Sequence, residues 1–259
     1  MSRLIRHEEF FRGAQGAAAA LTSLNQFPGL LAWYDASDLT TQLQASGGAA
    51  VAANNDPVGY VADKSGNGYH ISQSTAGNKF TLKTNVLNGK SVWELDGADV
   101  LSCASVPIST FTIFAVFRAS SGNLVYEHSV NSGPNNGSYI NATNNAAINV
   151  RRTGLSTQWD ISATWGQGNT WRVVDQHYEG THLSHGLSIN GVAQTLTPRV
   201  LSDDPGTGMA TEPLFIGARN TGSIGIVGQL AEIAIFSPYL SAANRSAARA
   251  IINARWAVY

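Results

Sequence analysis

Glu232 is the residue of this chain whose surroundings most resemble a catalytic strand. It lies in Gly228–Phe236, a short apolar run that we predict to be a strand covered on both faces. Glycoside hydrolysis needs two carboxyl groups about 5–10 Å apart, and every second residue of a strand faces the same side. Ala234 and Phe236 occupy those positions. We therefore predict a buried or edge carboxylate bonded to backbone or to an arginine, with no catalytic role.

Three histidines, His177, His182 and His185, have a spacing that loosely resembles a metal cluster. We place His177 at the end of a strand and the other two in the following loop. Zinc needs convergent ligands, usually with a second layer of hydrogen bonds, so solvated loop histidines are the favoured interpretation. The chain has no nucleophile elbow, phosphate-binding loop or dinucleotide fingerprint. These observations predict no metal site and no enzyme.

Sugar binding is the third chemistry that the residues suggest. Trp159, Asp160 and Trp165 lie in a polar, turn-rich segment. Exposed indole rings stack on sugars, and carboxylates accept hydrogen bonds from hydroxyl groups. These three residues are our candidates for glycan contact. A loop folded over the core is the alternative.

The composition fits many short strands joined by turns. The chain has 259 residues, of which 26 are glycine and 13% are charged, compared with about 25% charged in an average domain. The net charge of −1 gives no electrostatic reason to expect nucleic acid or anionic membrane as a partner. A single cysteine, Cys103, excludes an internal disulfide and is expected to be a small core residue.

Local patterns place the main elements. Phe111–Arg118 is apolar at both parities, which predicts a second strand in mid-sheet. Asn88-Gly89 and Asn190-Gly191 are hairpin dipeptides. Ser241 stands at the N-cap position of a helix predicted over Ala242–Trp256.

Residues 1–27 differ from the rest of the chain. Leu4, Ile5, Phe10 and Phe11 give a partly amphipathic helical pattern. A helix packed on the main domain, an arm that docks on a partner protein, and a disordered segment all remain open. We name these four side chains as candidates for partner attachment because apolar side chains of this size are costly to leave in water.

A series of motifs resembles the laminin-G-like, concanavalin A-like lectin/glucanase superfamily. The resemblance begins near Pro28 and continues to the C-terminus. In chain order the motifs are Trp33–Ser37, Asp63–Gly68, Leu95–Gly97, Phe111–Arg118, Ser188–Val192 and Leu214–Arg219, followed by the strand and helix at Gly228–Trp256.

The resemblance implies an all-β fold, a two-sheet antiparallel jelly-roll β-sandwich of the concanavalin A-like kind. It would occupy residues 28–259 and end in the C-terminal helix, after a helical N-terminal arm over residues 1–27. Glucanase-type relatives carry E-x-D-x-E on one strand, of which only Glu232 is present here. Relatives also commonly bind calcium at the rim, where Asp160, Asp203 and Asp204 would be available. No spaced acidic motif supports calcium, so we predict no cofactor and keep calcium as an alternative.

The expected function follows from the resemblance and from targeting signals. Glu8 and Glu9 interrupt any secretory signal, and Ala17–Leu21 is too short to span a bilayer. A lectin-like sandwich made in a host cytoplasm suggests a phage particle. We predict a non-catalytic structural protein on the virion surface, attached to capsid or tail proteins by the arm, as a decoration protein or on a tail fibre. A carbohydrate-binding module for cell-surface glycans is the alternative, and a degenerate glycoside hydrolase or lyase is a third reading.

Overall fold

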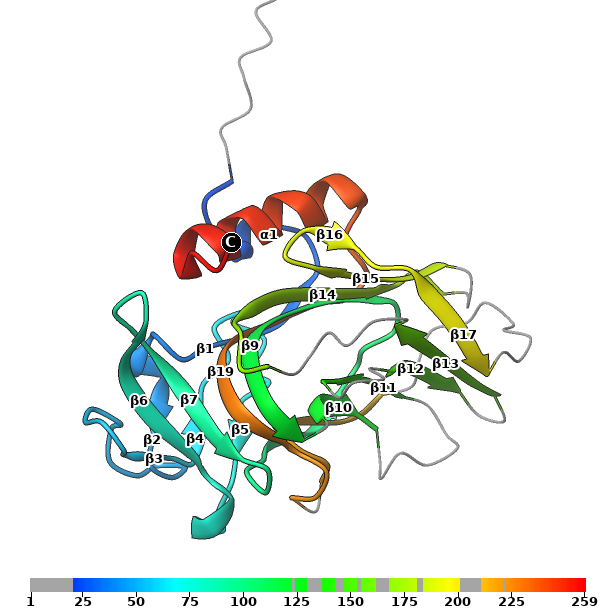
Figure 1. Ribbon diagram of the computed structural model, residues 1–259. Coiled ribbons are helices and arrows are strands. Elements are labelled where there is room, and N and C mark those ends of the chain that lie inside the picture. The colour runs from blue at the N-terminus through cyan, green and yellow to red at the C-terminus, as the bar shows by residue number, and fades with distance from the viewer. Residues whose placement is uncertain are drawn as a thin grey trace, which may run out of the picture.

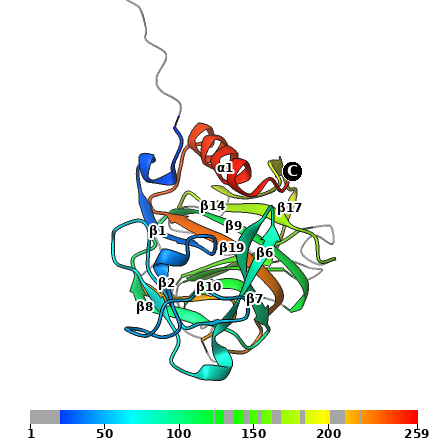
Figure 2. The same ribbon diagram turned by 90° about the vertical axis from the view of Figure 1, so that its left-hand side faces the viewer.

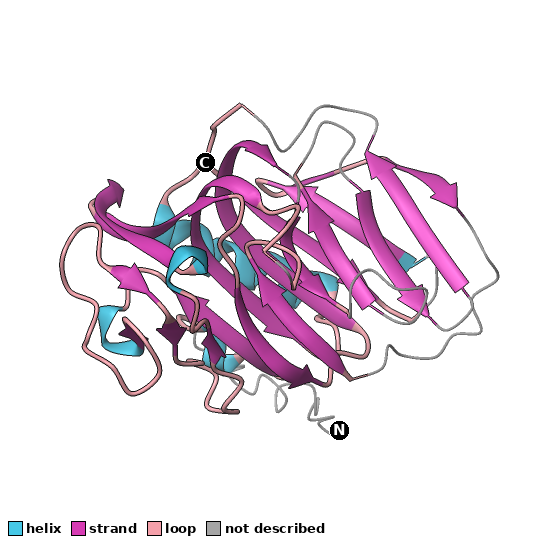
Figure 3. Cartoon of the chain, turned by 90° about the horizontal axis from the view of Figure 1, so that it is seen from below, coloured by secondary structure: helices cyan, strands magenta, loops and turns pink. Residues whose placement is uncertain are grey.

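Two antiparallel β-sheets lie face to face in the computed structural model, and one α-helix covers the outer side of the first sheet (Figure 1). The structure describes residues 21–122, 124–129, 137–142, 147–152, 155–161, 168–180, 184–200, 211–220 and 222–259. Figure 3 shows the two layers of strands from below. This arrangement confirms the predicted β-sandwich with a C-terminal helix.

In the described part of the chain, the first sheet, sheet A, has nine strands. Their order is β16 (Val192–Ala193), β15 (His185–Ile189), β14 (Arg172–Tyr178), β9 (Phe111–Gly122), β19 (Ile226–Phe236), β7 (Lys90–Asp96), β6 (Phe80–Leu87) and β3 (Pro57–Val58), with β1 (Leu30–Asp35) paired to β19. The Asn-Gly pairs at the β6–β7 and β15–β16 turns all have positive φ, between 49° and 80°. This conformation is typical of two-residue hairpin turns.

The second sheet, sheet B, has ten strands among the residues that the structure describes. Their order is β17 (Leu196–Val200), β13 (Leu155–Ile161), β12 (Ala147–Arg152), β11 (Gly137–Asn141), β10 (Leu124–His128), β18 (Glu212–Ile216), β8 (Leu101–Val106), β5 (Ile71–Ser72), β4 (Tyr60–Val61) and β2 (Gln42–Leu43). Three short 3₁₀ helices complete the described elements: η1 (Leu24–Gln26), η2 (Leu39–Thr41) and η3 (Ala76–Asn78).

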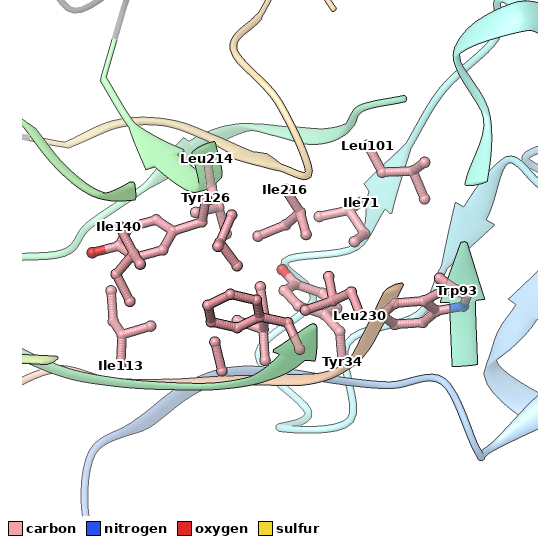
Figure 4. Packing of buried hydrophobic residues seen from close by; sticks show 14 of the residues in the cluster. Tyr34, Ile71, Trp93, Leu101, Ile113, Tyr126, Ile140, Leu214, Ile216 and Leu230 are labelled. Atoms are coloured by element: carbon pink, nitrogen blue, oxygen red, sulfur yellow. The ribbon is translucent and has the colours of Figure 1, made fainter. Parts of the chain in front are cut away.

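The main core fills the space between the sheets. Figure 4 shows Tyr126, Leu214 and Ile216 from sheet B above Ile113 and Leu230 from sheet A. All five side chains are fully buried. Cys103 is partly buried against this core, as expected for a small core residue.

The middle strands of sheet A are covered on both faces, as predicted from their apolar residues at both odd and even positions. On β9, Ile113 and Phe117 pack into the core between the sheets. Phe114 and Val116 point the other way, into a second apolar cluster. That second cluster lies beneath helix α1 (Ala242–Trp256), which crosses the outer side of sheet A (Figure 2).

Helix α1 begins as predicted, because the Ser241 hydroxyl accepts a hydrogen bond from the Asn244 amide at 3.3 Å. Its buried residues are Ala248, Ile252 and Trp256, four apart, so they form one stripe facing the sheet. Within the described residues, no helix is both long enough and apolar enough to cross a bilayer.

The last residues of the range assigned to the arm are part of the fold. Leu24 is 0% exposed and Phe27 is 3% exposed. The Phe27 ring meets Phe236 edge to face, with centroids 6.3 Å apart. Residues 1–20, including the predicted attachment residues Leu4, Ile5, Phe10 and Phe11, lie outside the described residues.

Candidate functional site

Glu232 lies on the outer side of sheet A beneath α1 and is 1% exposed. The pairing of β19 with β9 shifts register between Leu230 and Glu232. Such a bulge lets neighbouring residues break the alternation of faces. One carboxylate oxygen accepts from the Trp33 indole at 2.6 Å and from Arg255, and the other accepts from the Trp256 indole.

The predicted role of Glu232 as a buried carboxylate bonded to an arginine is confirmed. Burial raises the pKa of Glu232 above its usual range, even though Arg255 opposes this effect. The two indole donors were not predicted, because Trp33 and Trp256 are distant in sequence from Glu232 and from each other.

Further charged side chains lie around Trp33, next to Glu232. The Lys64 ammonium lies 3.0 Å from Asp35 and 2.7 Å from Asp38. The Lys64 nitrogen is 4.4 Å from the centroid of the Trp33 ring, and the Arg255 guanidinium carbon is 5.0 Å from it. Each of these carboxylates is paired with a cation, and two cations lie close to the Trp33 ring. The arrangement therefore links α1 and β1 to β19.

The predicted glycan contacts fall largely outside what the structure describes. Trp165 lies outside the described residues, as do the side chains of Trp159 and Asp160. The backbone differs from the expected turn-rich segment, because Leu155–Ile161 forms strand β13. Leu155, Trp159 and Ile161 share one parity along this segment, which is typical of one face of a strand.

A different set of polar side chains crosses the outer face of sheet A. We call this set the polar row: Lys83, Glu94, Gln229, Arg118 and Trp171. The Lys83 ammonium lies 3.1 Å from Glu94, and the Gln229 amide nitrogen is 3.3 Å from the same carboxylate. Gln229 accepts a hydrogen bond from Arg118 Nε at 2.9 Å, and the Arg118 guanidinium carbon is 5.3 Å from the centroid of the Trp171 ring.

Strand pairing explains why the polar row is continuous. Glu94 is directly opposite Gln229, and Gln229 is directly opposite Arg118. Directly paired residues on adjacent strands are close enough for their side chains to interact. The neighbours of Arg118 in sequence, Phe117 and Ala119, point into the core, so Arg118 points outward.

The polar row borders a shallow depression of about 320 Å³. Its lining includes Glu94, Arg118 and Gln229 from the row, together with Ser120 and Asn169. Arg118 and Gln229, each a polar residue in a largely apolar strand, are the sequence signal that could have indicated this site. The sequence does not show that these strands are neighbours.

The histidines predicted to be solvated lie apart from the polar row. His177 is in β14 and His185 is the first residue of β15, and the Nδ1 atoms of both rings are buried. The predictions that His185 lies in a loop and that these two histidines are solvated are therefore wrong. His182, Asp203 and Asp204 lie outside the described residues. Within the part of the chain that the structure describes, no three His, Cys, Asp or Glu side chains form a group that could hold a metal ion.

Comparison with known proteins identifies the fold but no family. No family model matches the chain, and no curated protein matches it in sequence. Among solved structures, Domain 4 of AbnA, a GH43 extracellular arabinanase from Geobacillus stearothermophilus in complex with arabinotriose, matches with a TM-score of 0.56 and 12% identity. The match covers 86% of this chain and 98% of that domain.

Two further matches are weaker. The CBM40 domain of the Ruminococcus gnavus IT-sialidase, bound to α2,3-sialyllactose, has a TM-score of 0.40 and 13% identity, over 52% of this chain and 79% of that one. A GH54 α-L-arabinofuranosidase has a TM-score of 0.49 and 17% identity, over 90% of this chain and 60% of that one. We therefore draw only on the match to the AbnA domain. With 12% identity, this match shows that the two chains share a β-sandwich fold.

Proposed function

We propose that this chain is a non-catalytic carbohydrate-binding module and that the polar row is its glycan site. The observation that carries the proposal is the unbroken chain of contacts from Lys83 to Trp171 across sheet A. The row crosses from β6 to the start of β14, which are four strand spacings apart. At about 4.8 Å per spacing, this corresponds to about 19 Å, a length suited to an oligosaccharide rather than a single sugar.

The groups of the row suit a ligand rich in hydroxyl groups. Glu94, whose side chain is 46% exposed, supplies acceptors. Arg118 supplies donors, and its hydrogen bond to the buried Gln229 holds the guanidinium group in place. Trp171 adds a partly buried indole at one end. Because neighbouring contacts already fix these side chains, less conformational entropy is lost when a ligand binds.

Two further observations support the proposal. The fold is shared with a domain whose structure was solved with arabinotriose, which makes a sugar ligand a reasonable expectation for this sandwich. Glu232, the residue that could have suggested hydrolysis, is buried and bonded to Trp33, Trp256 and Arg255. A carboxylate enclosed in this way favours a structural role.

The predicted phage role rests on the sequence alone. Attachment to capsid or tail proteins was assigned to the N-terminal arm, most of which lies outside the described residues. A structural protein displayed on a virion surface therefore stays a prediction. Glycan binding by such a displayed sandwich would be compatible with it.

Glycan-array screening with neutral oligosaccharides, followed by calorimetry on the best ligand, tests the proposal. We expect Arg118→Ala to weaken binding about tenfold or more, since a hydrogen bond to a charged group contributes about 1.5–3 kcal/mol. Lys83→Ala should weaken binding less. Lys90→Ala is the matched control, because Lys90 lies on the same hairpin outside the row, and its affinity should stay unchanged.

Thermal melts establish that each variant is folded. Wild-type protein that binds no oligosaccharide, or a folded Arg118→Ala variant that binds as tightly as wild type, would refute the proposed site.

A further inference from the structure

A second depression lies between helix α1 and the edge of sheet A formed by β14, β15 and β16. We call it the His177 groove. Its volume is about 440 Å³, within the range of about 300–1,000 Å³ typical of small-molecule sites. The polar side chains that line it include His177, Ser188, Gln194, Arg245 and Arg249. It shares no lining residue with the depression beside the polar row.

Two arginines on successive turns of α1 point toward the sheet. Arg249 donates from Nε to Asp175 at 2.6 Å and from Nη2 to the Ser188 hydroxyl at 3.2 Å. Arg245 donates from Nη1 to Glu179 at 3.2 Å and to the Leu240 carbonyl at 2.8 Å. These contacts fix both guanidinium groups. Within the described residues, Nη1 of Arg249 and both Nε and Nη2 of Arg245 have no hydrogen-bond partner.

The His177 ring is held flat against the backbone of the next strand. A Cβ atom at Gly186 would lie 2.2 Å from His177 Cε1, so glycine is required for the ring to occupy this place. His177 Nδ1 is buried and has no hydrogen-bond partner in the described structure. Buried polar atoms are rarely left unpaired, and the His177 side chain lines the groove.

The charges around the groove favour an acceptor ligand. Asp175 and Glu179 are already paired with Arg249 and Arg245. Ala242, the first residue of α1, also lines the groove, and the positive end of a helix dipole favours an anion there. Guanidinium groups match the geometry of planar carboxylates and of phosphates.

We propose that the His177 groove binds a small oxyanion, such as the carboxylate of an acidic sugar or a phosphate group. Arg245 and Arg249 supply the unpaired N–H donors, and His177 supplies a further hydrogen bond. This site is separate from the polar row, so it does not depend on glycan binding there.

Histidine titration gives a direct readout of occupancy. Burial lowers the pKa of His177 to about 4, and Arg245 contributes to the shift. An anion beside the ring stabilises the imidazolium form and should raise this pKa. The charged and titratable groups around the ring, whose titration must be separated from that of His177, are Asp175, Glu179, His185, Arg245 and Arg249.

The experiment is an NMR titration of the His177 Cε1 proton in the full chain, with inorganic phosphate, glucuronate or glucose. We expect saturable binding of phosphate, glucuronate or both, with a rise in the His177 pKa, and none with neutral glucose. Binding of phosphate alone would identify a phosphate group as the ligand chemistry, and binding of glucuronate alone would identify a carboxylate.

Arg245→Gln and Gly186→Ala should each weaken oxyanion binding at least tenfold, the second by displacing the His177 ring. Lys90→Gln, which lies outside both the polar row and the His177 groove, is the control and should leave oxyanion binding unchanged. Because Gly186→Ala can also disturb the fold, Arg245→Gln decides the outcome. The absence of saturable binding, or binding that Arg245→Gln leaves unchanged, would overturn the proposal.

Discussion

Glu232→Gln is the most informative single substitution for the attachment of α1 to sheet A. The carboxylate accepts hydrogen bonds from two indoles and one guanidinium. Glutamine keeps one acceptor oxygen and replaces the other with an amide group that donates. If the amide nitrogen replaces the oxygen that Trp256 bonds, one donor faces another donor, and if it replaces the oxygen that Trp33 and Arg255 share, two do.

The expected loss of stability combines two effects. A buried donor left without a partner costs about 1–3 kcal/mol, and removal of one partner of a buried ion pair costs about 3–5 kcal/mol. The cost of the unpaired donor and the cost of the broken ion pair overlap, because both concern Arg255. In addition, a neutral amide does not carry the cost of burying a charge, which is what raises the pKa of Glu232. We therefore expect the unfolding free energy to fall by about 3 kcal/mol in total. At about 2–4 °C per kcal/mol for a chain of this size, Tm should fall by about 6–12 °C.

Thermal and urea unfolding followed by circular dichroism measure this effect. Glu94→Gln is the matched control, because Glu94 also pairs with a cation but its side chain is 46% exposed. Exposed pairs contribute about 0–1 kcal/mol, so the control should melt close to wild type. If Glu232→Gln melted with the control, the carboxylate would not fasten α1 and this reasoning would be refuted.

Four further results are expected. Leu24→Ala should lower the unfolding free energy by about 2–5 kcal/mol, because Leu24 is fully buried; a melt unchanged from wild type would place residues 24–27 outside the cooperative fold. Burial lowers the pKa of His128 to about 4, so this side chain binds fewer protons in the folded than in the unfolded chain between pH of about 4 and 6.5, and its contribution to stability, measured by urea unfolding, should fall as pH drops through that window. His128→Gln should reduce this pH dependence, and an unchanged slope would contradict the assignment. EDTA should leave Tm within about 5 °C of its original value, since a bound ion would stabilise the fold; a larger drop would indicate a bound metal. No hydrolysis of common polysaccharides is expected, and turnover that Glu232→Gln abolishes would contradict the structural role of Glu232.

The sequence was sufficient to predict those strands and the helix start whose pattern lies within a few consecutive residues. The double apolar parity of Phe111–Arg118 and Gly228–Phe236 predicted two strands covered on both sides, and the structure has them as β9 and β19. Ser241 predicted the start of α1 because an N-cap acts within its own helical turn.

Features that depend on distant contacts were not predictable in the same way. Leu24 and Phe27 were grouped with the arm because their burial depends on packing against residues more than 200 positions away. The polar row joins residues from β6, β7, β9 and β19, and only the strand order shows that Glu94, Gln229 and Arg118 are neighbours. One chain without aligned relatives carries no signal for such pairings.

The position of β19 also has a consequence for synthesis of the chain. β19 pairs with β9, β7 and β1, yet all three precede it by more than 100 residues in sequence. During translation these strands leave the ribosome long before their shared partner exists. The middle of sheet A cannot form until residues 226–236 have emerged, because β19 lies between β9 and β7. The outer side of the sheet stays uncovered until α1 has also emerged. Such long-range pairing slows folding and leaves apolar strand edges open to aggregation. We therefore expect nascent chains stalled before residue 226 to be sensitive to protease and to engage chaperones.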